Sequence, residues 1–119
     1  MTKKIMIADD DAGIVDFISI LLEFEGYKVI ATLNGASVLD LKHDLPDLLL
    51  LDIWMSGVDG RDICKELKRR EETRNMPVVM ISASKDIEQS AIDSGADDFL
   101  AKPFELDELL RKIKKNMRS

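Results

Sequence analysis

Short apolar runs alternate along this chain with longer amphipathic segments. Four of the runs lie at residues 5–8, 48–51, 78–81 and 99–101. Each is too short for a helix and too apolar for a strand with one solvated face, so we interpret them as strands buried on both faces of a parallel sheet. A fifth strand is predicted at 27–31, at or near an edge of that sheet.

The segments between the runs have the spacing of helices. Apolar residues recur at helical spacing over 14–22, and Gly26 follows, which readily takes the left-handed conformation of a helix C-cap. The segment 53–60 contains two glycines and no periodicity, which predicts a loop. The other helices are predicted to follow the cap Asn34, to begin at or near Asp59, and to cover 87–94 and 106–117.

This order of elements predicts an α/β fold, a doubly wound parallel sheet of five strands with helices on both faces. The chain has 119 residues, which fits a single domain over 1–119. Asp11 is placed to cap the first helix, an ordinary structural role.

The composition of the chain restricts the cellular compartment and the classes of binding partner that we expect. The formal net charge of −6 argues against a general nucleic-acid surface, so we expect no direct nucleic-acid partner. Cys64 is the only cysteine and has no intramolecular disulfide partner, which favours a reducing compartment. No apolar run approaches the length of a membrane span, and the N-terminal residues lack the long apolar stretch of a signal peptide. The sequence therefore predicts a soluble, cytoplasmic protein without a membrane partner.

Polar residues come directly after four of the apolar runs. They are Asp9 and Asp10, Asp52, Ser82 and Lys102. Because parallel strands place all their carboxyl ends along one edge, and ligands bind at that edge of open α/β sheets, these side chains are predicted to converge.

Crowded carboxylates repel one another and have raised pKa values unless a cation lies among them. Hard oxygen ligands with room for water suit Mg²⁺, with Mn²⁺ as an alternative, and no Cys/His cluster favours zinc. We therefore predict a divalent cation held by two carboxylates, a backbone carbonyl and waters. Such a site suits a phosphoryl group, with Asp52 as the nucleophile that forms an aspartyl phosphate, and Lys102 and Ser82 as contacts to the phosphoryl oxygens.

Four motifs in this chain resemble those of one family, the receiver (CheY-like) domain of two-component response regulators. They are KIMIADDD at 4–11, PDLLLLDIWMSGVDG at 46–60, PVVMISA at 77–83 and GADDFLAKPF at 95–104. Together they span essentially the whole chain. The resemblance implies a flavodoxin-like sheet with strand order 2-1-3-4-5.

The resemblance also implies a role for each acid. Asp52 matches the phospho-accepting aspartate, and Asp10 matches the direct metal ligand. Asp9 matches the acid that acts mainly through water, and Trp54 occupies the position whose backbone carbonyl completes the metal's protein ligands.

The remaining motif residues match the switch of the family. Ser82 matches the switch hydroxyl, Phe99 the aromatic that changes rotamer with it, and Lys102 the lysine that contacts the phosphoryl group. The Lys102–Pro103 peptide bond is expected to be cis by the same resemblance. The implied output surface is formed by the helix over 87–94, the last strand and the last helix.

The implied function is that of a phosphoacceptor signalling domain rather than an enzyme, since it catalyses only its own phosphorylation and slow autodephosphorylation. The phosphodonor is a histidine kinase or histidine phosphotransfer protein, and the output is a downstream protein or a fused domain. The chain is either a stand-alone regulator or a receiver cut from a longer protein. Asp97, Asp98, Glu108 and Lys112 suit the charged dimer face of transcription-factor receivers, but 87–94 has no basic residue, so monomer and phosphorylation-dependent dimer both stay open.

Three positions depart from the common pattern. Trp54 either shields the acyl phosphate from water or packs on the loop or a partner. Ser56 replaces a common proline, which predicts a less rigid loop, and Phe99 lacks the hydroxyl of the commoner tyrosine, which favours its inward state.

Three other functions are weighed against this one. A phosphatase with an aspartyl-phosphate intermediate needs a second acid or base and a cap over its substrate, and nothing in the sequence supplies a cap. A flavin or nucleotide binder needs glycines and donors in the first loop, which is acidic here. A pseudo-receiver is disfavoured because the acids, the hydroxyl and the lysine are all present.

Overall fold

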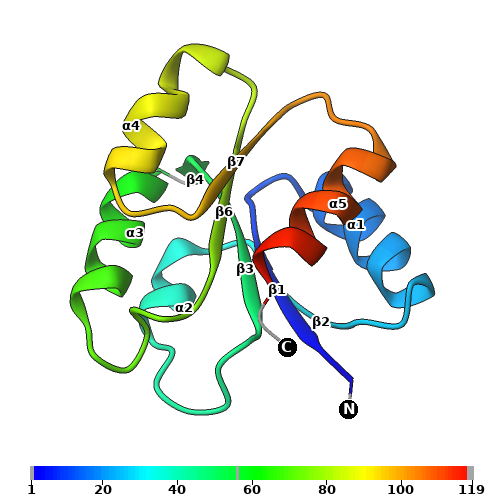
Figure 1. Cartoon of the computed structure of the whole chain (residues 1–119), viewed down its shortest axis with the longest axis horizontal. Helices are drawn as coiled ribbons and strands as arrows, with labels where there is room; N and C mark the ends of the chain where they lie inside the picture. The colour runs from blue at the N-terminus through cyan, green and yellow to red at the C-terminus, as the bar shows by residue number, and fades with distance from the viewer. Residues whose placement is uncertain (1, 56, 118–119) are drawn as a thin grey trace.

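The main sheet has five parallel strands in the order β2-β1-β3-β6-β7, which confirms the predicted doubly wound fold (Figure 1). The computed structural model describes residues 2–55 and 57–117. The strands are β1 (Lys4–Ala8), β2 (Lys28–Thr32), β3 (Leu48–Asp52), β6 (Val78–Ser82) and β7 (Asp98–Ala101). The register pairs Ala8 with Leu51, Asp52 with Ile81, and Ser82 with Ala101, so the carboxyl ends of the central strands are level.

Helices cover both faces of this sheet. Their bounds are α1 (Ala12–Phe24), α2 (Gly35–Leu39), α3 (Gly60–Arg69), the 3₁₀ turn η1 (Lys85–Ile87), α4 (Glu88–Asp93) and α5 (Leu106–Asn116). Figure 1 shows α1 and α5 on one side of the sheet and α2, α3 and α4 on the other. Among the described residues, no helix has the length and apolar character needed to cross a membrane.

Local chemistry sets where the helices begin and end. Side-chain oxygens of Asp11, Asn34 and Asp59 accept hydrogen bonds from backbone N–H groups in the first turns of α1, α2 and α3. Each such cap contributes about 1 kcal/mol by satisfying donors that have no partner within the helix. Gly26 and Gly95 follow α1 and α4 with φ values of 95° and 105°, a conformation that glycine adopts without a steric penalty.

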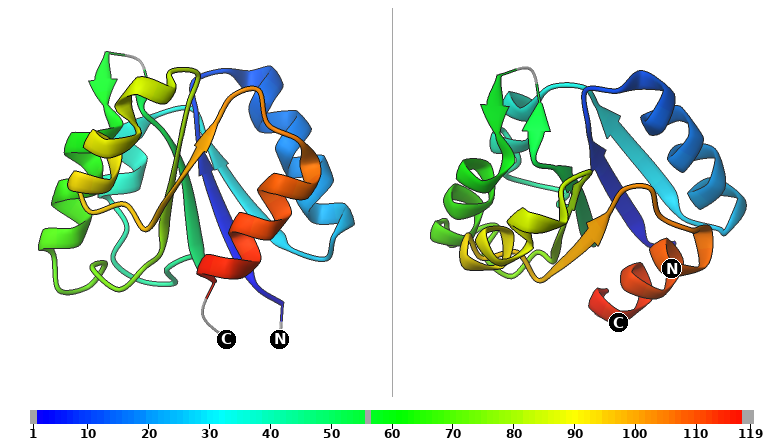
Figure 2. Two further views of the ribbon diagram at one scale, coloured as in Figure 1. Left: turned by 45° about the horizontal axis from the view of Figure 1, so that its top comes forward. Right: turned by 90° about the horizontal axis from the view of Figure 1, so that it is seen from above.

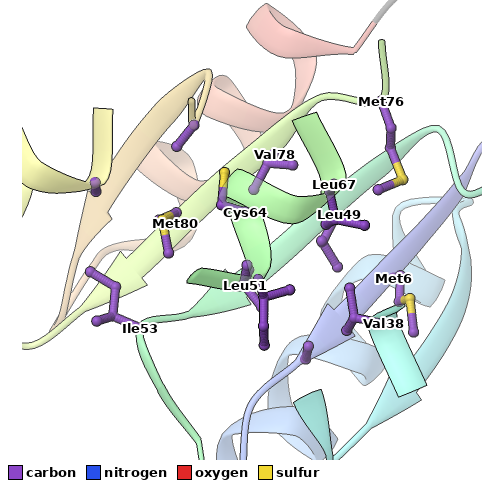
Figure 3. Close-up of a cluster of buried hydrophobic side chains, with 14 of the residues drawn as sticks. Met6, Val38, Leu49, Leu51, Ile53, Cys64, Leu67, Met76, Val78 and Met80 are labelled. Atoms are coloured by element: carbon purple, nitrogen blue, oxygen red, sulfur yellow. The ribbon is translucent and has the colours of Figure 1, made fainter. Parts of the chain in front are cut away.

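The core has two layers, one on each face of the sheet, and β3 contributes to both. Leu48 and Leu50 face the layer under α1 and α5, whereas Leu49 and Leu51 face the layer under α2, α3 and α4. All four leucines are fully buried. Figure 3 shows the second layer, where Leu49 and Leu51 lie among side chains of α2, α3 and β6. Burial on both faces is why the sequence of this strand is continuously apolar rather than alternating.

The structure corrects the sequence analysis in three places. The segment predicted as a loop contains an antiparallel hairpin, β4 (Trp54–Met55) and β5 (Val58–Asp59), in which Trp54 pairs with Asp59. Its two-residue strands are too short to give a periodic signal. The helix predicted over 87–94 is slightly shorter, since α4 covers Glu88–Asp93 and the 3₁₀ turn η1 ends at Ile87. Finally, Asp52 and Ser82 are the last residues of their strands rather than the first residues after them. The prediction for Ser56 lies outside the described residues.

Candidate functional site

The predicted site residues lie at the carboxyl edge of the sheet, where β1, β3 and β7 end. Figure 2 shows this edge with the hairpin β4–β5 rising from it beside α3. Asp9 and Asp10 follow β1, Asp52 ends β3, and Lys102 follows β7. Carboxylate oxygens of Asp9, Asp10 and Asp52 lie within 4.8 Å of one another, as the sequence analysis predicted from the parallel strands.

Lys102 connects two of these acids. Its Nζ donates to Oδ2 of Asp9 at 2.9 Å and to Oδ1 of Asp52 at 3.3 Å. Asp9 is 2% exposed, and its other oxygen accepts from the backbone N–H of Asp11 at 3.0 Å. The ammonium of Lys102 therefore contacts two acidic groups at once, so the charges of Asp9 and Asp52 together exceed the charge of the lysine that joins them.

That imbalance changes the acidity of the groups. Burial and then the charge of Asp9 raise the pKa of Asp52 to about 6, and the charge of Lys102 only partly opposes them. Burial lowers the pKa of Lys102, but its contacts with Asp9 and Asp52 outweigh this and leave the pKa above its ordinary value. Lys102 is thus charged at neutral pH, while Asp52 exchanges its proton close to the physiological range.

The donor set fits Mg²⁺ in its chemistry. Three carboxylates converge, and one of them belongs to an exposed residue. Their negative charge would attract a cation. Carboxylate oxygens with access to water are the ligands that Mg²⁺ prefers. Asp9, Asp10 and Asp52 are the side chains that would hold it.

Two backbone segments approach each other closely beside Asp52. The chain passes directly over the end of β3 as α3 begins, and a Cβ added at Gly60 would clash with the backbone oxygen of Asp52. Only glycine leaves room for this contact. The glycine at the start of α3 therefore allows the backbone to lie against the end of the strand that carries Asp52.

The other predicted site residues surround this cluster. Ser82 is 5% exposed, and its Oγ accepts from the backbone N–H of Ser84 at 3.1 Å. Phe99 is 4% exposed and lies in the core layer under α3 and α4. The Lys102–Pro103 peptide bond is cis. Trp54 is 58% exposed.

One residue beside the site was missed by the sequence analysis. Arg61, near the start of α3, contacts Asp59, Ser90 and the ring of Trp54. Its partner on α4 is 29 residues away in sequence. The only local signal was the spacing of Asp59 and Arg61, and it does not reveal the contact with α4.

The family model of the response regulator receiver domain matches residues 5–114. The chain belongs to this family. This chain is 41% identical over 118 residues to the DNA-binding dual master transcriptional regulator RpaA from Synechocystis. The match covers 97% of this chain and 49% of RpaA, so the chain spans about half the length of that relative.

Solved structures of receiver domains have the same fold. A CheY-like response regulator receiver domain protein from Methanospirillum hungatei has a TM-score of 0.86 at 28% identity, over 97% of this chain and 93% of that one. The response regulator TrrA from Thermotoga maritima, solved in complex with Mg²⁺-BeF, has a TM-score of 0.88 at 27% identity, over 98% and 100% of the two chains. The receiver domain is thus a signalling domain of two-component systems.

Proposed function

We propose that this receiver domain accepts a phosphoryl group on the carboxylate of Asp52 in a Mg²⁺-dependent reaction. One observation carries the proposal: oxygens of Asp9, Asp10 and Asp52 converge, and Lys102 reaches two of these acids. An excess of buried negative charge is costly unless a cation or a reaction makes use of it. The Mg²⁺-BeF complex of TrrA supports the assignment by similarity.

The proposed donor is a phosphohistidine on a histidine kinase or histidine phosphotransfer protein. An oxygen of Asp52 bonds to phosphorus while the phosphorus–nitrogen bond breaks, and the histidine nitrogen keeps the electron pair. Lys102, already 3.3 Å from Asp52, pairs with the transferred oxygens. Mg²⁺, when bound, would neutralise charge on the phosphoryl oxygens. Water later hydrolyses the acyl phosphate, so the domain does not turn over an external substrate.

The proposed switch begins at Ser82. A new dianion at Asp52 draws the Ser82 hydroxyl away from the backbone N–H of Ser84, which it contacts in this structure. Phe99 is already buried, so its rotamer change takes place within the core layer rather than between surface and core. The result is a population shift of the surface formed by α4, β7 and α5, the surface we assign to the output partner.

We propose that residues 1–119 form one receiver domain that works in the cytoplasm. Its output is a downstream protein or a fused domain. The domain acts as a monomer or as a phosphorylation-dependent dimer. The printed name of RpaA assigns DNA binding to that protein, and we propose no direct nucleic-acid contact for this domain.

The mass of the intact protein after incubation with acetyl phosphate tests the proposed chemistry. We expect a single phosphoryl adduct that needs Mg²⁺ and is absent in Asp52→Asn. The matched control is Asp98→Asn, which changes an aspartate of equal exposure, 9%, on β7 and should keep the adduct; β6 separates β7 from the strand of Asp52. An adduct that survives Asp52→Asn, or forms equally well in EDTA, would overturn the assignment.

A further inference from the structure

Arg61 has three contacts that link separate elements of the molecule. Its Nη2 donates to Oδ2 of Asp59 at 2.6 Å, and its Nε donates to Oδ1 of Asp59 at 3.0 Å. Its Nη1 donates to Oγ of Ser90 in α4 at 2.9 Å. Its guanidinium carbon lies 5.6 Å from the centre of the Trp54 ring. One side chain therefore touches the hairpin on two strands and the neighbouring helix.

We infer that Arg61 is a positioning residue that couples Trp54, two residues after Asp52, to α4. The coupling is a local property of the fold. Its consequence for phosphorylation rests on the proposed function, because that function assigns Asp52 the phosphoryl group and α4 the output surface. Neither the family model nor the names of the relatives assign a role to Arg61 or Ser90.

The geometry suits arginine rather than lysine. The guanidinium is a flat fork with five donors, so one group can pair with a carboxylate, donate to a hydroxyl and present its face to an aromatic ring. The side chains of Arg61 and Asp59 are 25% and 20% exposed, which shields their pair partly from water. A lysine would keep the charge but could not make these contacts in one orientation.

The α4 end of the link is also fixed. The hydroxyl of Ser90 donates its proton to the backbone oxygen of Ile87 at 3.0 Å, so its lone pairs face the Nη1 of Arg61. A displacement of α4 by about 1 Å would break this bond, because hydrogen bonds weaken steeply beyond their usual distances. Arg61 would then be held by Asp59 alone, and its contact with the ring of Trp54 would loosen.

Linkage makes this coupling reciprocal. If the Arg61–Ser90 bond favours the α4 position seen here, any ligand at Asp52 that favours another position must work against that bond. Loss of the Arg61–Ser90 bond should therefore make phosphorylation of Asp52 more favourable and faster. Because this bond is partly exposed to solvent, we assign it the strength of an ordinary hydrogen bond, which corresponds to about a 5- to 10-fold change in an equilibrium.

Trp54 reports on the link directly, since it is the only tryptophan of the chain. We would measure acrylamide quenching of its fluorescence in wild type, Ser90→Ala and Arg61→Ala, with circular dichroism to check folding. Gln89→Ala is the matched control, because Gln89 lies on the same helix and bonds only to Asp93 at the surface in the contacts seen here. We expect the quenching constant to rise from wild type to Ser90→Ala to Arg61→Ala, and Gln89→Ala to match wild type. Arg61→Lys, which keeps the charge and is the safer variant for folding, should behave as Arg61→Ala does.

The second measurement is the rate of adduct formation from acetyl phosphate with Mg²⁺. Ser90→Ala should react about 5- to 10-fold faster than wild type, and Gln89→Ala at the wild-type rate. Equal quenching in wild type, Ser90→Ala and Arg61→Lys would overturn the inference, whatever the phosphorylation result. If quenching rises as expected but wild type forms no adduct, the proposed function fails and the local coupling stands.

Discussion

Asp52 and Asp98 are two aspartates with the same burial and opposite electrostatic surroundings. Each residue is 9% exposed, and each carboxylate contacts a lysine. Asp98 also accepts from the side-chain amide of Asn116 at 2.8 Å and from the backbone N–H of Phe99 at 2.8 Å. Asp52 shares its single lysine with Asp9 and lies beside Asp10.

The two pKa values move in opposite directions as a result. Burial raises the pKa of Asp98, but the donors from Asn116, Lys112 and Phe99 outweigh it and leave the pKa below its ordinary value. For Asp52, burial and the charge of Asp9 outweigh Lys102 and raise the pKa to about 6. Burial alone therefore does not mark a reactive acid. The distinction lies in whether the surrounding donors satisfy the charge, as at Asp98, or satisfy it only in part, as at Asp52, our proposed phosphoacceptor.

Replacing the two lysines separately should produce the largest contrast. Lys102→Met should slow phosphorylation by acetyl phosphate about 100-fold, because a charged donor to the transferring oxygens is lost. Lys112→Met, which removes the lysine beside Asp98, should leave that rate within about twofold of wild type. Time courses of intact mass would measure both rates. Similar losses in the two variants would contradict a special role for Lys102.

Asp98→Asn should lower the free energy of unfolding at pH 7 by about 2 kcal/mol, because the ion pair that joins β7 to α5 is lost while Lys112 stays half-buried. The pKa of Asp98 is lowered from 3.8 in the folded state, so its stabilisation is present above that value and is lost as the pH falls through the folded pKa. Urea unfolding at pH 7 and pH 3 should show a smaller difference from wild type at the lower pH. A pH-independent difference would mean that the charge of Asp98 is not what stabilises the fold.

Asp52→Asn should instead raise the free energy of unfolding, by about 1–2 kcal/mol at pH 7.5 in EDTA. This figure allows for screening of the charge by solvent. The pKa of Asp52 rises from 3.8 to about 6 on folding, so between these values the folded state binds more protons and wild-type stability falls as the pH rises. Asparagine removes this dependence. The gain should therefore be largest above pH 6 and absent below pH 4 in urea titrations, and a loss of stability at pH 7.5 would contradict it.

Binding of Mg²⁺ should change stability by the smallest amount, and it tests the contrast between Asp52 and Asp98 again. With Mg²⁺ at about ten times its dissociation constant, the free energy of unfolding of wild type should rise by about 1.4 kcal/mol, because the ion binds the carboxylates only in the folded state. Asp98→Asn should gain the same amount, and Asp52→Asn should gain less. Thermal unfolding with Mg²⁺ and with EDTA measures this. Equal gains in all three proteins would place the ion elsewhere.

Much of the fold could be predicted because the signals are local. The apolar runs of β3 and β6, the caps Asp11 and Asn34, and Gly26 after α1 each act within a few residues, and the structure confirms them. The meeting of Asp9, Asp10 and Asp52 could also be predicted, because parallel strands have one common carboxyl edge.

Other features depend on groups that are distant in the sequence. The pairing of Trp54 with Asp59, the orientation of Ser82 toward Ser84 and the contact from Arg61 to Ser90 have no periodic signature. In the sequence, Asp98 looked like a surface charge of a dimer face, yet it is a buried partner of Lys112 within the same chain.

The sequence by itself determined which residues reach the carboxyl edge, because strand period and parallel geometry place them there. Only the tertiary structure decided the pKa of each acid. A pKa sums the burial and charges of all neighbours in space, and these come from strands and helices far apart in the chain. That sum separates Asp52, with its surplus of negative charge, from Asp98, whose donors satisfy it.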